Sequence, residues 1–333
     1  MAIGTKTVGE FGGKPVVEFG LRSDTGVEVD ILSWGVVVRD WRVPVAGGMR
    51  SVVLGFDDFA PYPKHSPHFG ALAGRVANRI SGSSFDLDGV TYKVAESMPG
   101  LTLHGGPEGL GLLNWSGEAD SQANAVRFTH FSPDGHMGFP GNVQFTATYT
   151  LEGNKLKLKL EAKADRRTPI NLVQHQYFNL GTGPDVLDHR YQIAASAYTP
   201  NDERLVPTGE ILPVGGTIWD FRKPRNMRDE KGEAIAYDGN LVLDTGRAAD
   251  APAVTVTGPD GLLTLKLWTD RPGVQLYNSV WTGVDAGGKQ FGRFSGFCLE
   301  DQAFPDAPHN PHFPSIIYGP GHDYLHHSDI EIA

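Results

Sequence analysis

Apolar and polar residues alternate most regularly between residues 143 and 162. Every second residue is apolar from Val143 to Leu151 and again from Leu156 to Ala162, and the turn 152–154 separates the two runs. Successive side chains of a strand point to opposite faces, so each run predicts a strand with one buried and one solvated face. The two runs together predict an antiparallel hairpin.

Shorter runs of the same kind predict further strands at 27–32, 35–41, 51–56 and 263–268, and Asp88-Gly89 predicts the turn of a hairpin over 84–92. No window of helical length keeps a 3.6-residue period, and we expect only one short helix, between Arg225 and Ala236. The pattern predicts an all-β fold of two packed antiparallel sheets. Since no repeat, linker or shift in composition marks a boundary, we expect a single domain over residues 1–333.

Composition and charge narrow the classes of function. The chain has 333 residues with 42 Gly and 23 Pro, which favours many short strands and turns. Its net charge is -10 and no basic face is visible, so we expect an uncharged substrate and no nucleic-acid partner. The single Cys298 excludes an intrachain disulfide, and its apolar surroundings indicate a buried structural thiol.

The first residues contain no apolar core of a signal peptide, and no stretch approaches the roughly 20 apolar residues of a membrane span. We therefore expect a cytoplasmic protein without a membrane partner.

Four polar groups of residues stand out from the strands. The block 74–80 holds Arg79 beside Asn78, and a guanidinium can hold ring hydroxyls or form a structural ion pair. His104 precedes two glycines, where a ligand can approach the backbone closely, although a lone His is more often structural. These two blocks therefore indicate a binding site only in combination with others.

The other two groups lie in apolar strands. Val173, His175 and Tyr177 would share one face of a strand, and a polar side chain there is either a hydrogen-bonded core residue or a working acid. Glu300 ends the apolar run 296–299 and precedes a Pro-bearing loop. A carboxylate in that position is either a base with a tuned pKa or the partner of an arginine.

In this order the blocks resemble the aldose 1-epimerase (galactose mutarotase) family over roughly residues 10 to 325. The matching pieces are Gly-Arg-Val-Ala-Asn-Arg-Ile, Leu-His-Gly-Gly, His-Gln-Tyr-Phe-Asn-Leu, Pro-Gly-Val-Gln, Gly-Phe-Cys-Leu-Glu and Pro-Asp-Ala. The resemblance implies a large β-sandwich with an open sugar cleft that interconverts the α and β anomers of free aldoses without metal or cofactor. Residue by residue it implies Glu300 as the base, His175 as the acid, and as sugar-binding residues Arg79, Asn78, His104, Asp238 and Gln275.

Four positions depart from the family pattern, namely Ser97, Gly239, His309 and Leu110. The residues matching the acid and the base are kept, so these departures concern the walls of the cleft. They leave open whether galactose, glucose, xylose or arabinose is preferred.

Ring opening of a hemiacetal suits the two residues that match the acid and the base. Glu300 would remove the proton of the anomeric hydroxyl and protonated His175 would deliver one to the ring oxygen, each contributing roughly 10²–10⁴-fold. His104 could polarise the ring oxygen, and Phe304 or Trp281 could stack on the sugar. No phosphate loop or dinucleotide fingerprint is present, so we expect no cofactor.

Three alternatives remain open at this point. Glu300 with Asp238 or Asp306 could form the carboxylate pair of a glycoside hydrolase. A non-catalytic sugar-binding sandwich would not need both His175 and Glu300. The histidines near the C-terminus could bind a metal, but their spacing fits no ligand pattern and we expect none. The expected partner is a monosaccharide, and the expected assembly is a monomer or weak homodimer.

Overall fold

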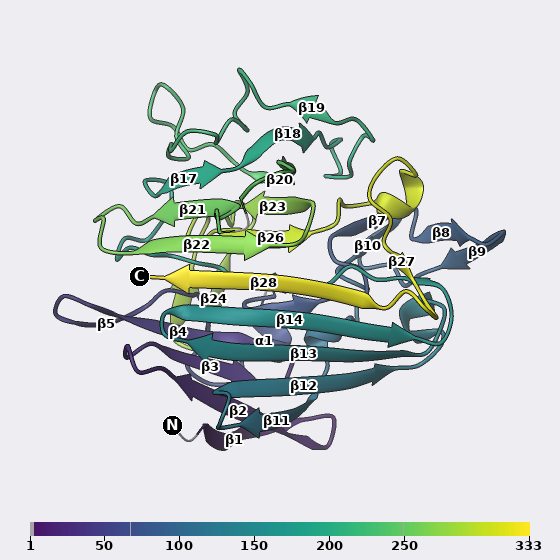
Figure 1. The fold of residues 1–333 in the computed structure, drawn as a ribbon, viewed down its shortest axis with the longest axis horizontal. Helices are drawn as coiled ribbons and strands as arrows, with labels where there is room; N and C mark the ends of the chain where they lie inside the picture. The colour runs from purple at the N-terminus through teal and green to yellow at the C-terminus, as the bar shows by residue number, and fades with distance from the viewer. Residues whose placement is uncertain (1–2, 67, 249) are drawn as a thin grey trace.

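The computed structural model describes residues 3–66, 68–248 and 250–333, and strands dominate it (Figure 1). The N-terminal sheet has five strands in sequence order: β1 (Gly4–Phe11), β2 (Lys14–Arg22), β3 (Glu28–Leu32), β4 (Val38–Val45) and β5 (Gly48–Ser51). The largest sheet has the order β11 (Ser116–Asp120), β12 (Ala125–Ser132), β13 (Val143–Glu152), β14 (Lys155–Ala164), β28 (Tyr324–Ile332), β22 (Thr264–Thr269), β21 (Val254–Thr257) and β17 (Arg190–Ile193).

A third sheet lies in the C-terminal half, with the order β19 (Leu212–Pro213), β18 (Ala195–Thr199), β20 (Asp238–Leu243), β23 (Gly273–Tyr277) and β26 (Cys298–Gln302). Short pairs complete the strands: β6 (Ala71–Ala73) with β16 (Val173–His175), β7 (Arg79–Ser81) with β10 (Leu101–Leu103), β8 (Ser84–Leu87) with β9 (Val90–Lys93), β15 (Thr168–Pro169) with β27 (Ile317–Tyr318), and β24 (Val284–Ala286) with β25 (Lys289–Phe291).

All strand pairs that the described residues form are antiparallel, and the sheets pack through a common apolar core. Phe19 of β2 meets Phe128 of β12 edge to face at 5.3 Å between ring centroids. The buried residues Leu276 and Leu299 add the third sheet to the same core. The all-β sandwich predicted from the alternation is confirmed.

The predicted hairpins over 143–162 and 84–92 are present as β13–β14 and β8–β9. Asp88 and Gly89 have φ values of +54° and +79°, which a two-residue turn of this kind needs. The run 263–268 forms β22. The run 35–41 is only partly a strand, because Gly35 turns with a φ of +62° and β4 begins at Val38.

Two sequence predictions are wrong. Residues 52–56 continue no strand, because Val52 and Leu54 bond to two different neighbours, Trp41 and Tyr177. The helix expected between Arg225 and Ala236 is absent, since the carboxylate of Asp229 accepts the backbone N–H groups of residues 231 and 233 and holds a tight turn.

Helical structure is confined to short pieces among the described residues: α1 (Tyr62–His65) and the single 3₁₀ turns η1 (Leu110–Leu112), η2 (His136–Gly138) and η3 (Ala307–His309). In the described part of the chain, no helix has the length and apolar character that a membrane crossing requires.

Candidate active site

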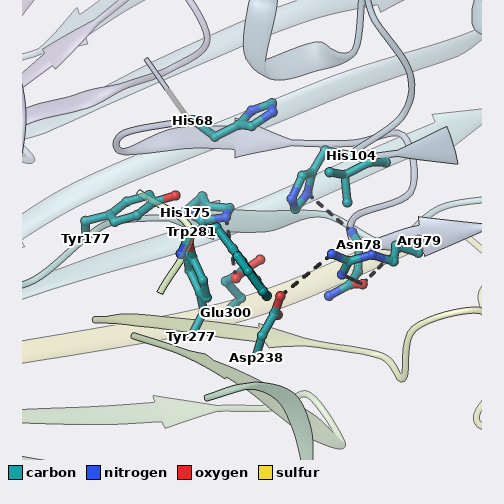
Figure 2. A pocket seen from close by; sticks show the side chains of 11 residues that line it. His68, Asn78, Arg79, His104, His175, Tyr177, Asp238, Tyr277, Trp281 and Glu300 are labelled. Atoms are coloured by element: carbon teal, nitrogen blue, oxygen red, sulfur yellow. Dashed lines mark hydrogen bonds and ion pairs between the residues drawn. The ribbon is translucent and has the colours of Figure 1, made fainter. Parts of the chain in front are cut away.

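One pocket collects most of the polar residues singled out in the sequence (Figure 2). Its volume is about 200 Å³, below the roughly 300–1,000 Å³ of pockets for drug-sized ligands, so it suits a small molecule. Six of the predicted site residues line it: Asn78, Arg79, His104, His175, Asp238 and Glu300. The other lining residues are His68, Leu103, Tyr177, Tyr277 and Trp281.

The C-terminal sheet supplies the two carboxylates of the pocket. Glu300 lies on β26 and Asp238 on β20, with β23 between them. Gln275 of β23 is buried, does not line the pocket, and donates a 2.7 Å hydrogen bond from Nε2 to Asp238 Oδ1. The structure therefore places Gln275 behind Asp238, where it fixes the orientation of that carboxylate.

The imidazole of His175 comes from the short strand β16, which pairs with β6 and packs beside β26. Its ring stacks on Tyr177 at 5.0 Å between centroids. This is the arrangement expected from residues 173, 175 and 177 sharing a strand face. The register of β16 thus brings the histidine to the carboxylate of Glu300.

Asn78 and His104 hold each other in unusual backbone conformations, with φ values of +59° and +51°. The His104 backbone N–H donates to the Asn78 carbonyl at 3.0 Å, and the Asn78 N–H donates to His104 Nδ1 at 3.3 Å. That second bond assigns the proton of the neutral ring to Nε2. Gly105 follows with a φ of +88°, and a Cβ there would overlap the Gly74 carbonyl, so only glycine fits the turn.

Arg79 stands opposite Asp238, with 3.7 Å between Nη2 and Oδ2. Burial raises the pKa of Asp238, and the nearby Arg79 guanidinium and Gln275 amide oppose that rise. The Asn78 side chain accepts from the Arg79 backbone N–H at 2.9 Å and from its guanidinium at 3.3 Å. The arginine fork is thereby aimed across the pocket (Figure 2).

Glu300 and His175 form the most buried ionisable pair of the pocket, with 3.5 Å between His175 Nε2 and Glu300 Oε1. Burial raises the pKa of Glu300 to about 8, and the Asp238 carboxylate adds to the rise. Burial lowers the pKa of His175 to about 3. At neutral pH the pair therefore holds one proton, mainly on the carboxyl group.

Several polar atoms of this region lack a hydrogen-bond partner among the residues that the structure describes. Those on residues that line the pocket are Glu300 Oε2, His175 Nδ1, His68 Nδ1 and Arg79 Nε. Buried polar groups are nearly always paired, so such a concentration indicates groups kept for a ligand.

Besides Leu103, sequence reasoning missed three polar lining side chains as site residues. Tyr177 and Tyr277 each follow a predicted site residue by two positions, so the period of a strand could have found them. His68 carried no such signal, because its position depends on a loop packed against a distant strand. Trp281 was named as a possible stacking group and lines the pocket with its side chain largely exposed, whereas Phe304 is buried in the core.

The departures from the family pattern have local explanations. The Ser97 hydroxyl bonds both backbone groups of Leu103, at 3.1 and 3.0 Å. His309 contacts the carboxylate of Asp306 at 2.8 Å. Leu110 is fully buried and does not line the pocket. At Gly239 a Cβ would lie 2.5 Å from Trp219, so the missing side chain makes room for the indole.

Metal-ligating side chains meet in the same pocket, since ligand atoms of His104, His175 and Glu300 all lie within 4.8 Å of one another. The C-terminal histidines form no such group among the described residues. His326 contacts Asp301 at 2.8 Å, and His327 contacts Asp270 at 3.3 Å. The expectation that the protein needs no cofactor or metal stays a prediction.

The fold and the pocket together define an antiparallel β-sandwich with a buried imidazole–carboxyl pair facing a small cavity. The aldose 1-epimerase family model matches residues 18–331. The chain is 41% identical to the galactose mutarotase of Rattus norvegicus, covering 97% of this chain and 96% of the relative. It is 32% identical to the aldose 1-epimerase of Escherichia coli strain K12, covering 94% of both.

Solved structures agree with the sequence relatives. An aldose epimerase homologue from C. elegans superposes with a TM-score of 0.90 at 26% identity, covering 95% of this chain and 98% of that one. A galactose 1-epimerase from Lactobacillus acidophilus gives 0.85 at 25% identity, covering 100% and 98%. The chain belongs to the aldose 1-epimerase family, and the predicted enzyme class, an isomerase that acts on carbohydrates, is confirmed.

Proposed function

We propose that Glu300 and His175 are the acid–base pair with which this epimerase opens and closes the ring of a free aldose. The observation that carries the proposal is the 3.5 Å contact of two buried, oppositely shifted ionisable groups at one pocket. Paired groups whose environments drive their pKa values apart are typical of acid–base catalysis.

In the opening step, ionised Glu300 removes the proton of the anomeric hydroxyl and protonated His175 delivers one to the ring oxygen. The step ends with Glu300 protonated and His175 neutral, which is the arrangement that burial of the two groups favours. The pocket thereby stabilises the state that accompanies the open chain. Rotation about the C1–C2 bond and the reverse proton transfers then close the ring as either anomer.

The sugar is held by groups on the remaining walls. Hydrogen bonds to the sugar hydroxyls are offered by Arg79, Asp238 and His104. The Asn78 side chain orients the Arg79 guanidinium. Gln275, expected to bind the sugar, acts in this proposal through Asp238. Sites that pair each substrate hydroxyl reject analogues that leave these groups unpaired.

The substrate is a monosaccharide, and galactose is the first aldose to test because the mammalian relatives are named galactose mutarotases. Glucose, xylose and arabinose remain alternatives. We also propose that residues 1–333 act as one domain, since Arg79 and His104 from the N-terminal half and Glu300 from the C-terminal half line one pocket. A cytoplasmic location and a monomeric or weakly dimeric state stay predictions.

Polarimetry on freshly dissolved α-D-galactose, α-D-glucose and α-D-xylose tests the proposal. We expect wild type to speed the approach to equilibrium and Glu300→Gln and His175→Asn to abolish the effect. Glu18→Gln makes the same change at a buried glutamate that does not line the pocket and should keep full activity. Equal activity of wild type and Glu300→Gln would refute the role of Glu300, and inactivity of wild type on every aldose would refute the function.

A further inference from the structure

His68 is a third imidazole at the pocket, beside the two predicted from the sequence. Its ring centroid lies 4.8 Å from that of His104 and 6.0 Å from that of His175, nearly parallel to the latter at 24°. His68 Nδ1 is buried and has no hydrogen-bond partner among the residues that the structure describes. Leaving a buried polar atom unpaired costs roughly 1–3 kcal/mol, so a role in packing alone does not explain it.

The backbone around His68 is fixed by neighbours of the catalytic pair. His68 has a φ of +67°, a left-handed conformation that costs a residue with a Cβ roughly 1–2 kcal/mol. The Ala71 N–H donates to the His68 carbonyl at 3.0 Å, and the Gly70 N–H donates to the carbonyl of His175 at 2.9 Å. The buried ring of Phe69 packs edge to face on Tyr177 at 4.9 Å.

These contacts fasten the turn that carries His68 to the strand that carries His175. A strained backbone and an unpaired imidazole persist together only where surrounding structure enforces them, and such residues cluster at ligand sites. The turn therefore holds His68 in place at the pocket wall.

The charge state of His68 suits a hydroxyl ligand. Burial lowers its pKa to about 4, so the ring is neutral at neutral pH. A neutral imidazole carries one donor and one acceptor. A sugar hydroxyl can use either of them, because it both donates and accepts.

The order of side chains around the pocket indicates which part of the sugar His68 meets. Figure 2 shows His68 and Asp238 on opposite sides of His175 and Glu300. If Glu300 faces the anomeric hydroxyl and His175 the ring oxygen, the next group along the ring beyond His175 is the substituent on C5. On the other side, Asp238 and Arg79 face the hydroxyls next to the anomeric carbon.

We propose that His68 is a substrate-contacting residue that binds the C6 hydroxyl of an aldohexose and so favours hexoses over pentoses. This inference rests on the proposed roles of Glu300 and His175, which orient the sugar. D-Galactose and L-arabinose differ only by this hydroxymethyl group, and D-glucose and D-xylose form a second such pair.

The test compares wild type with His68→Leu and His68→Asn on both sugar pairs. Asparagine tolerates the left-handed backbone and keeps a donor and an acceptor, whereas leucine keeps bulk without hydrogen bonds. We expect His68→Leu to lose about 10-fold in kcat/KM on the hexoses, mainly through KM, and to change little on the pentoses. His68→Asn should retain most of the hexose preference, and melting curves should show both variants folded.

Calorimetric titration of the same sugars gives a readout that does not need turnover. A hexose-selective loss of affinity in His68→Leu supports the inference even if wild type turns over none of the sugars, a result that would contradict only the proposed function. If His68→Leu lost affinity equally for hexose and pentose, or for neither, the role of His68 would be overturned. The epimerase activity of wild type would still be evidence for the proposed function.

Discussion

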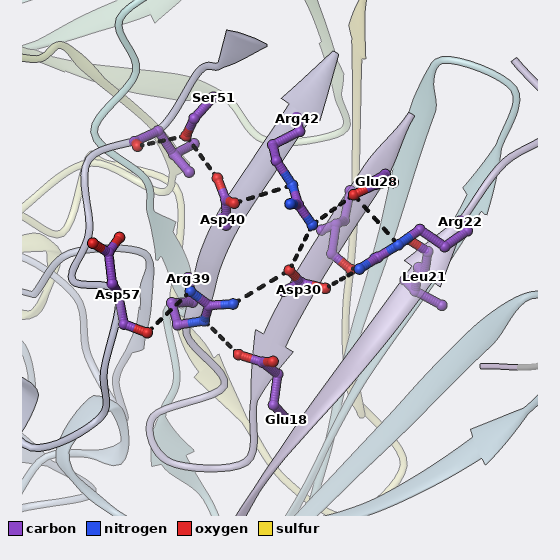
Figure 3. A network of polar contacts seen from close by, with 12 residues as sticks. Glu18, Leu21, Arg22, Glu28, Asp30, Arg39, Asp40, Arg42, Ser51 and Asp57 are labelled. Atoms are coloured by element: carbon purple, nitrogen blue, oxygen red, sulfur yellow. Dashed lines mark hydrogen bonds and ion pairs between the residues drawn. The ribbon is translucent and has the colours of Figure 1, made fainter. Parts of the chain in front are cut away.

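Two clusters of charged residues in this molecule are built on opposite principles. On the N-terminal sheet, the buried carboxylate of Asp30 contacts Arg22 at 2.8 Å, Arg39 at 3.3 Å and Arg42 at 3.2 Å (Figure 3). Glu18 contacts Arg39 and, at 3.3 Å, Lys6. Each of these carboxylates is shared among basic partners, as expected of a cluster that holds strands together.

The pocket uses similar residue types and leaves them incompletely paired. Among the described residues, the Glu300 carboxyl group has one polar contact, to the neutral imidazole of His175, and its second oxygen lacks a partner. Burial without compensation costs free energy, and here it raises the pKa of Glu300 to about 8. The comparison shows that incomplete pairing distinguishes the candidate catalytic cluster from the structural one. It predicts that mutations of the pocket residues change activity and that mutations in the Asp30 cluster change stability.

The largest effect is expected for Glu300→Gln, which keeps the shape and removes the base. We expect kcat to fall by roughly 10³-fold or more, because a positioned acid or base contributes roughly 10²–10⁴-fold to the rate and the loss of Glu300 also deprives His175 of its partner. The free energy of unfolding at pH 7 should not fall, because the replaced group is a buried and mainly protonated carboxyl. Polarimetry and urea unfolding check the two parts, and a residual activity above one tenth of wild type would contradict the first.

Asp30→Ala should show the reverse behaviour. Removing the carboxylate leaves three guanidinium groups without their shared partner, and we expect a loss of about 3 kcal/mol in the free energy of unfolding. The kcat of the folded protein should stay at the wild-type value, because Asp30 is not a pocket residue. A variant that unfolds like wild type in urea would show that this cluster is not structural.

Gly239→Ala tests whether a residue that is next to the pocket, but does not line it, affects catalysis. Gly239 follows Asp238 on β20, but a Cβ there would meet Trp219, which stacks on Tyr198 at 5.6 Å. We expect overpacking to cost about 1–2 kcal/mol of stability, a KM raised about threefold through Asp238, and an unchanged kcat. A large fall in kcat with normal stability would contradict this expectation.

The smallest effect is expected for Lys6→Ala. Lys6 pairs with Glu18, but its side chain is 69% exposed. Exposed ion pairs contribute about 0–1 kcal/mol, so both unfolding and activity should stay close to wild type. A loss comparable to that of Asp30→Ala would mean that the cluster acts as one cooperative unit that includes its rim.

The sequence predicts those strands that have one solvent-exposed face and one buried face. Alternation located β13 and β14 because the residues between their buried apolar positions are polar, mainly Gln and Thr on β13 and mainly Lys on β14. The prediction failed at residues 51–56, because the backbone of this apolar run hydrogen-bonds first to one neighbouring segment and then to another. It also failed at residues 225–236, because the Asp229 side chain caps a turn and outweighs the helix propensity of the segment.

The candidate site was predictable where a residue belongs to an ordered block of the family pattern, as Glu300, His175 and Arg79 do. The position of His68 was not predictable, because it follows from a left-handed turn bonded to the carbonyl of His175 more than a hundred residues away. The place of Gln275 behind Asp238 likewise depends on the pairing of β20 with β23. Contacts between distant segments are the information that a single sequence lacks.

The pH dependence of kcat/KM for α-D-galactose, corrected for the uncatalysed rate, tests the shared proton of Glu300 and His175 most directly, since kcat/KM reports the free enzyme. The Glu300 pKa of about 8 and the His175 pKa of about 3 predict a pair that holds one proton throughout the range between them. We therefore expect kcat/KM to stay constant from pH 5 to 7 and to fall by the loss of one proton above about pH 8. A narrow bell between the ordinary values, about 4.3 for Glu and 6.5 for His, would contradict the buried single-proton pair.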